Sequence, residues 1–162
     1  MSRPAWYLLV IGEREALRWI LSTERMAFPE RRRHDARRLC PGDGLLLYTT
    51  RGAFHNPTRD RGRVIGEARV ASPALGLDSP IVVAGREFTT ACDIEVLSLA
   101  PVLHGVELAP LVTDMKAFPD PATWSVRLRR PLVPLPAADA NRLRRELRRV
   151  AGDPSAALSG YA

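Results

Sequence analysis

Three histidines, His34, His55 and His104, are the side chains best suited to act as general bases or metal ligands. Each lies in a different segment, with no HExxH motif and no pair of cysteines nearby, so a histidine metal site is not expected. His55 and Asp60 share one polar segment with several arginines, which is the nearest approach to an acid–base pair for RNA cleavage. A small ribonuclease-like hydrolase is therefore kept as an alternative hypothesis.

Motifs that activate a nucleophile or bind a nucleotide phosphate do not occur in the sequence. There is no GxSxG motif, and the GDG at 42–44 lacks the lysine and the hydroxyl residue that complete a P-loop. The sequence therefore predicts a protein that is not an enzyme and that needs no metal and no cofactor.

The charge of the chain points to a polyanionic partner. The formal net charge is +6, and Lys116 is the only lysine, so nearly all of the positive charge is arginine. A basic excess is a common feature of proteins that bind nucleic acid, although each arginine can equally face solvent without a partner. The candidates for phosphate contacts are Arg31, Arg32, Arg33, Arg51, Arg59 and Arg61.

The length of 162 residues is typical of one domain. We expect a single domain over 1–154, a loosely held tail over 155–162, and a monomer. No apolar run is long enough to span a bilayer and the N-terminus does not resemble a signal peptide, so we expect no membrane partner and a cytoplasmic location. Cys40 and Cys92 match no metal or redox spacing, which favours two buried free thiols.

The first half of the chain alternates strands and short helices. The continuous apolar run at 6–11 predicts a strand that is buried on both faces. Apolar residues at helical spacing predict a helix over 13–22, and the arginine-rich segment 30–39 is compatible with a short second one. A turn then leads into a second buried strand over 45–50.

The second half is predicted to be mostly strand. A long polar loop over 51–62 connects to an alternating strand over 63–71, which should pair antiparallel with the strand before the loop. Another loop, over 72–80, precedes a long strand over 86–99, and 124–135 is assigned to a final strand.

An amphipathic helix over 140–150 is the last expected element, because Ala140, Leu143, Leu147 and Val150 form an apolar stripe. Together these elements predict an α+β fold that is mostly β. Its architecture would be a small barrel of five to six mixed strands, closed or nearly closed and flanked by short helices.

Several short motifs, taken in order, resemble the EVE domain, a member of the PUA-like superfamily and a structural relative of the YTH domain. They span almost the whole chain. The motifs are Trp6 at the start of the first strand, Phe28 with Pro29, PGD followed by LLLY ending at Tyr48, VIGEARV, and PLVTDMKAFPDPATWS.

The resemblance implies a PUA-like barrel that binds a modified or flipped base of DNA or RNA in a pocket. Such a base is held by stacking on side chains and identified by hydrogen bonds to its edge. Several relatives carry Trp where this chain has Met26, and Met provides no rigid stacking surface. The candidate pocket residues are Trp6, Met26, Phe28, Tyr48, Thr49, Asp114, Lys116 and Trp124.

Each candidate also has a structural explanation. The aromatic residues can belong to the core, and Asp114 and Lys116 can form an ion pair or a helix cap. Thr49, Thr50 and Arg51 follow a strand and are candidates to hydrogen-bond a base or phosphate, or are ordinary strand residues. A small-ligand sensor that uses the same pocket without nucleic acid remains the second hypothesis.

Overall fold

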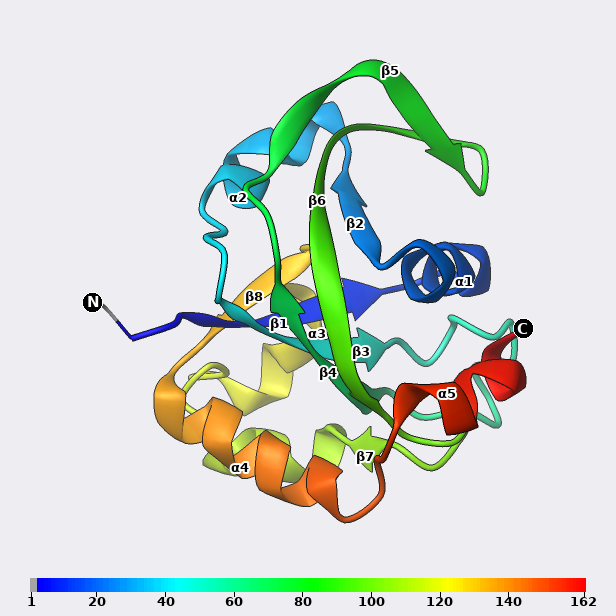
Figure 1. The fold of residues 1–162 in the computed structure, drawn as a ribbon. Coiled ribbons are helices and arrows are strands. Elements are labelled where there is room, and N and C mark those ends of the chain that lie inside the picture. The colour runs from blue at the N-terminus through cyan, green and yellow to red at the C-terminus, as the bar shows by residue number, and fades with distance from the viewer. Residues whose placement is uncertain (1–2) are drawn as a thin grey trace.

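One strongly curled sheet forms the centre of the protein (Figure 1), seen in a computed structural model that describes residues 3–162. Its strands follow the order β2-β6-β4-β3-β1-β8, with β5 added to β6 and β7 added to β4. The mostly β fold with mixed strands is confirmed. The strands are β1 (Trp6–Ile11), β2 (Arg25–Phe28), β3 (Gly44–Thr49), β4 (Arg63–Val70), β5 (Leu75–Val83), β6 (Arg86–Leu99), β7 (Val106–Glu107) and β8 (Leu132–Leu135).

Short helices flank the sheet on both faces (Figure 1). Within 3–162, no helix has the length and apolar character needed to cross a membrane. The α-helices are α1 (Arg14–Thr23), α2 (Arg33–Arg37), α3 (Trp124–Arg127), α4 (Ala137–Arg148) and α5 (Pro154–Ala157). The 3-10 helices are η1 (Glu30–Arg32), η2 (Ala109–Asp114), η3 (Pro121–Thr123) and η4 (Leu158–Tyr161).

The parallel strands β1 and β3 are buried on both faces, which explains their continuous apolar sequences. Alternate side chains of each strand enter two different hydrophobic cores. The first core contains Leu9 and Leu47 and is covered by α1, β2 and the C-terminal residues. The second core contains Leu8 and Leu46 and is covered by η2 and α4.

The sheet curls because β6 is long and because its pairings contain irregularities. The C-terminal half of β6 pairs with β4, whereas its N-terminal half pairs with β2 and β5. The register shifts between Leu47 and Tyr48 in β3 and between Glu67 and Ala68 in β4, and such bulges bend and twist a sheet. Beside the second irregularity, position 66 requires glycine, since a Cβ there would lie 2.5 Å from the Ser98 carbonyl oxygen.

Two segments of the second half differ from the sequence-based expectation. Residues 72–80 were assigned to a loop, but β5 begins at Leu75 as an exposed strand that pairs with β6. The strand expected over 124–135 is divided, because Asp120 accepts a hydrogen bond from the Ala122 amide at 3.2 Å and starts the helical turns of η3 and α3. Only β8, after Pro131, is extended.

The C-terminal residues, expected to be loosely held, form α5 and η4 and pack against the body. The Tyr161 side chain is 2% exposed, and its hydroxyl donates a hydrogen bond of 2.6 Å to the Ala100 carbonyl oxygen. The Arg14 guanidinium also donates to the Ala162 carbonyl oxygen. Burial of a large aromatic ring and these two hydrogen bonds therefore hold a segment that has little apolar periodicity.

The two cysteines should differ in reactivity, because Cys40 is exposed whereas Cys92 is 3% exposed. Both had been expected to be buried. Burial, with a smaller contribution from Asp93, raises the pKa of Cys92 to about 12, and only a thiolate is a good nucleophile. A disulfide reagent at pH 8 should therefore modify one thiol per native chain and two in urea. The variant Cys40→Ser should show none in the native state, and rapid modification of Cys92 would contradict this account.

Candidate functional site

A pocket of about 270 Å³ opens where the parallel strands β1 and β3 end. Its lining includes Ile11, the last residue of β1, and the residues that directly follow the two strands, Gly12 and Thr50. The Thr50 amide donates a hydrogen bond of 3.0 Å to the Ile11 carbonyl oxygen, which holds the two strand ends together. The carboxyl ends of parallel strands are a common place for ligand binding.

Apolar and aromatic side chains form the floor and walls of the pocket. Met26 is only 1% exposed and lies at the floor, while Trp19 from α1 and Phe88 from β6 are partly exposed in the walls. These are the two aromatic residues in the lining. Partly exposed aromatic walls over an apolar floor provide the surface that a planar ring needs for stacking.

Two backbone features hold the remaining walls in place. The β5–β6 hairpin turns tightly through Ala84 and Gly85, whose φ angles of 52° and 74° match the two positive values of a type I′ turn. This turn places Phe88 beside the pocket. On the other side, the Val10 amide donates a hydrogen bond of 2.9 Å to the Pro131 carbonyl oxygen and fixes the preceding residues against β1.

The mouth of the pocket is strongly basic. Five arginines from three separate segments line it, whereas Glu13 is the only acidic residue that the described residues contribute to the lining. Among residues 3–162, one of these arginines forms an ion pair, namely Arg32 with Asp35 at 3.8 Å. The α1 helix also begins here without a side-chain cap. The positive end of its dipole therefore adds to the positive electrostatic potential at the pocket mouth. The five arginines are Arg31, Arg32, Arg86, Arg129 and Arg130.

The arrangement is suited to binding a planar group that carries negative charge. The aromatic walls can contact a ring, the Thr50 hydroxyl and the Glu13 carboxylate can hydrogen-bond to its edge, and the arginines can contact phosphates. Within the described part of the chain, the lining includes no histidine and no cysteine.

Of the residues proposed from the sequence, the pocket brings together Met26, Arg31 and Arg32. Thr50, considered with Thr49, also lines it. Thr49 itself is buried, and its hydroxyl lies 3.5 Å from the Arg63 carbonyl oxygen.

The other proposed aromatic residues lie in the hydrophobic cores. Phe28 belongs to the first core and is fully buried. Tyr48 belongs to the second core, where burial raises its pKa to about 12. Trp124 packs edge-on against Phe118 at 6.1 Å between ring centroids, and Trp6 lies at the far end of β1 from the pocket.

Asp114 and Lys116 are exposed side chains next to the second core rather than at the pocket. Asp114 forms an ion pair with Arg142 at 3.3 Å. The backbone of Lys116, rather than its side chain, is fixed by a hydrogen bond. The buried Asp139 carboxylate accepts hydrogen bonds from the Lys116 amide at 3.1 Å and from the Ala117 amide at 2.7 Å. The PLVTDMKAF segment therefore has a structural explanation.

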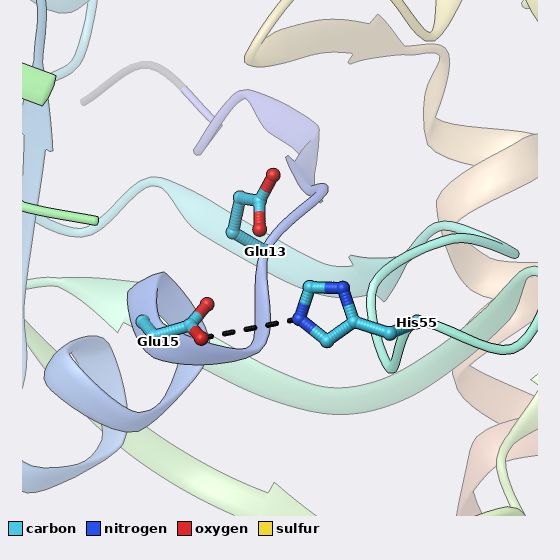
Figure 2. A group of neighbouring side chains, drawn as sticks. All are labelled: Glu13, Glu15 and His55. Atoms are coloured by element: carbon cyan, nitrogen blue, oxygen red, sulfur yellow. Dashed lines mark ion pairs between the residues drawn. The ribbon is translucent and has the colours of Figure 1, made fainter. Parts of the chain in front are cut away.

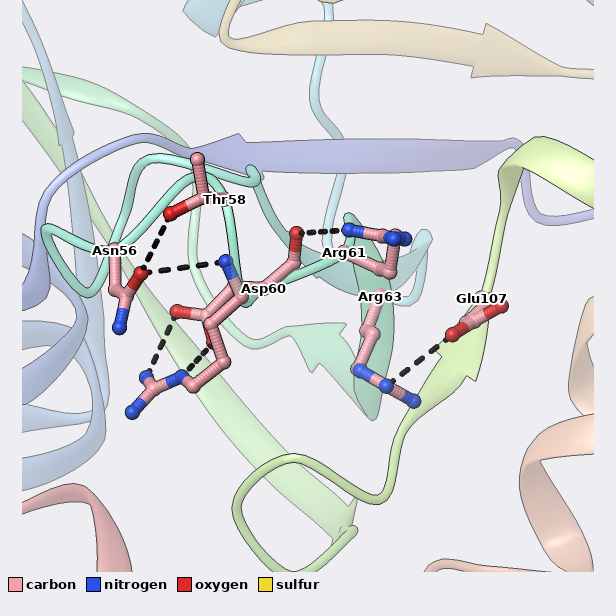
Figure 3. Close-up of polar contacts among 7 residues, drawn as sticks. Asn56, Thr58, Asp60, Arg61, Arg63 and Glu107 are labelled. Carbon is pink, nitrogen blue, oxygen red and sulfur yellow. Dashed lines mark hydrogen bonds and ion pairs between the residues drawn. The ribbon is translucent and has the colours of Figure 1, made fainter.

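Most arginines of the polar loop 51–62 interact within the loop (Figure 3). Arg59 forms two hydrogen bonds with the carboxylate of the buried Asp60, and these bonds lower the pKa of Asp60. Arg61 donates to the Asp60 carbonyl oxygen at 3.3 Å. Arg33, outside the loop, pairs with Glu30 at 2.8 Å, and Arg51 is exposed away from the pocket lining.

Sequence reasoning did not identify Trp19, Phe88, Arg86 and the pair Arg129–Arg130. For Trp19 a signal existed, since it lies beside the predicted apolar stripe of α1 rather than within it. The others come from a hairpin and a connecting loop, and their convergence depends on the curl of the sheet.

No protein-family model and no curated protein matches the sequence. The structure is similar to the YTH domain of the Zygosaccharomyces rouxii MRB1 protein in complex with N6-methyladenosine RNA, with a TM-score of 0.59 and 16% identity over 92% of this chain and 90% of that one. It is also similar to human THYN1 in complex with DNA that contains 5-methylcytosine, with a TM-score of 0.57 and 12% identity over 88% and 97%. The Mmi1 YTH domain in complex with RNA gives a TM-score of 0.58 and 11% identity over 93% and 85%.

These matches establish the fold. The chain has a PUA-like fold of the YTH and THYN1 type. The PUA-like architecture expected from the sequence is thus confirmed, whereas the narrower assignment to the EVE family goes beyond what the matches establish.

Replacing Asp139 with Ala should destabilise the fold, because two backbone amides lose their acceptor, one of them in a buried hydrogen bond. An unsatisfied buried donor costs about 1–3 kcal/mol of unfolding free energy. Lys116→Ala should change it by less than about 0.5 kcal/mol, as is usual for exposed positions. Urea unfolding of both variants tests this, and an equal loss in the two would contradict the structural role given to Asp139.

Proposed function

We propose that this chain is a non-catalytic nucleic-acid-binding domain of the EVE type that takes a modified or extruded base into the pocket between Trp19 and Phe88. The observation that carries the proposal is an aromatic-walled pocket whose mouth is lined by five arginines and one carboxylate. The similar structures support it, since three of them are complexes with RNA or with methylated DNA.

Two groups of side chains would contact different parts of the nucleic acid. The base would lie on the partly exposed rings over the apolar floor at Met26, with the Thr50 hydroxyl and the Glu13 carboxylate available to its edge. An ionised carboxylate accepts hydrogen bonds but donates none, so Glu13 favours a base that presents an N–H group. The sugar–phosphate backbone would lie across the arginines, which provide affinity without sequence preference.

A small-ligand sensor is the competing function for the same pocket. An anionic planar metabolite would use the same rings and the same arginines. The two functions differ in what lies outside the pocket, because only a nucleic acid has flanking phosphates to contact several arginines at once.

Trp19→Ala should weaken binding of single-stranded oligonucleotides, because it removes one aromatic wall. Stacking of a base on an aromatic side chain contributes about 1–3 kcal/mol, so the dissociation constant should rise about 5- to 150-fold. Trp19→Phe, which keeps a ring, should retain most of the affinity, and thermal melting should show that both variants fold. Unchanged affinity in Trp19→Ala, measured by fluorescence anisotropy, would exclude this pocket as the base site.

The double substitution Arg129→Ala and Arg130→Ala should reduce the salt dependence of binding. Each phosphate contact on a single strand contributes about −0.7 to the slope of log K against log salt, so loss of two contacts should reduce its magnitude by about 1.4. Arg145 and Arg148, exposed on α4 and away from the pocket, provide the matched control and should leave the slope unchanged. Equal slopes for both double variants and the parent would favour the sensor.

A further inference from the structure

Glu13, Glu15 and His55 converge beside the beginning of α1 (Figure 2). The two glutamates come from the N-terminal end of the helix, and the histidine comes from the loop between β3 and β4. One ligand atom from each of the three side chains lies within 4.8 Å of the other two. The group thus combines an imidazole with two carboxylates contributed by separate parts of the chain.

Contacts that do not involve the glutamates hold His55 in this position. Ala53 is fully buried, and the Phe54 ring packs against Tyr161 with 6.4 Å between centroids. The His55 amide donates a hydrogen bond of 3.0 Å to the Gly52 carbonyl oxygen. The loop would therefore present the imidazole to α1 even if the glutamates were replaced.

None of the three side chains is committed to a hydrogen bond within the described part of the chain. Glu13 occupies the N-cap position, but its side chain accepts no capping hydrogen bond. The His55 Nε2 atom lies 3.9 Å from the Glu15 Oε1 atom, which is too long for a hydrogen bond. The neighbouring Arg14 guanidinium donates to the Ala162 carbonyl oxygen rather than to either glutamate.

The spacing suits a shared metal ion. Zinc lies about 2.0–2.2 Å from nitrogen and carboxylate ligands, so two atoms that share one zinc ion are at most about 4.4 Å apart. The 3.9 Å between His55 and Glu15 fits within this limit. The side chains of Glu15 and His55 are half-exposed and can rotate, so any pair near the 4.8 Å bound can close by the few tenths of an ångström required.

We propose that Glu13, Glu15 and His55 form a binding site for one divalent transition-metal ion of the zinc class. Imidazole with carboxylates suits zinc, whereas magnesium prefers oxygen ligands and retains its waters. Three protein ligands leave a coordination position open. Glu13 also lines the pocket, so the ion binds at the rim of the pocket rather than within it. This site was not expected from the sequence, because the three histidines are isolated along the chain.

Isothermal titration of the 162-residue chain with zinc chloride tests the site in the absence of nucleic acid. The protein carries no histidine tag and has the substitution Cys40→Ser, which removes the exposed thiol as a competing ligand. We expect one ion per chain and a rise in melting temperature with zinc, and no comparable effect of magnesium. Absence of stoichiometric zinc binding at pH 7.5 would overturn the proposal.

Variants then locate the ion. His55→Ala and Glu15→Gln should each weaken zinc binding at least tenfold and abolish the zinc-dependent rise in melting temperature. His34→Ala, His104→Ala and Glu24→Gln change the same residue types elsewhere on the surface and should bind as the parent does. Retention of parental affinity in both site variants would overturn the proposal. Because the titration uses the metal alone, its result is independent of whether the pocket binds a base.

Discussion

The parallel pairing of β1 with β3 is the constraint on which the rest of the structure depends. Two parallel neighbours need a long crossover, and here the 32 residues between Ile11 and Gly44 supply it with α1, β2, η1 and α2. The crossover must cover the first core, so α1 and β2 pack over the same end of the pair. The carboxyl ends of both strands then open beside the beginning of α1, and the pocket follows from that geometry.

The second core explains why the residues that carry the family resemblance are mostly remote from the pocket. Tyr48 and Trp124 pack on the opposite face of the sheet, beneath η2 and α4. There, the Asp139 carboxylate fixes the backbone at Lys116. These residues hold the sheet and its covering segment together. They indicate the fold but do not mark the pocket, which agrees with structural similarity at 11–16% identity in the absence of a family match.

The sequence predicted those elements whose apolar periodicity is strong. It identified β1, β3, β4, β6, α1 and α4, because buried strands and amphipathic helices leave clear patterns. It missed β2, which has four residues, and β5, which is mostly exposed and contains Asp78 and Pro80. For these two strands the determinant is pairing with β6, and a long-range partner leaves no local signal.

The candidate site was less predictable, because composition cannot distinguish one arginine from another. Arg32 and Arg59 both lie in basic segments, yet the first lines the pocket whereas the second forms hydrogen bonds with a buried carboxylate. What separates them is the presence of Asp60 next to Arg59 and the placement of η1 beside β2. The net charge of +6 therefore gives only the excess of basic over acidic residues, while the fold decides which arginines line the pocket.

The two proposed sites share the beginning of α1. A helix that starts beside the ends of two parallel strands directs uncapped N–H groups and its first acidic side chains toward one edge. Arginines from the hairpin and from the loop before β8 surround that edge, and His55 approaches it from the loop after β3. Glu13 belongs to both proposed sites, so an ion held there would neutralise a carboxylate at a basic pocket mouth. Metal binding would then strengthen the attraction for phosphates and so raise the affinity for nucleic acid. It would also compete for the Glu13 carboxylate and so weaken the selection of a base by that acceptor.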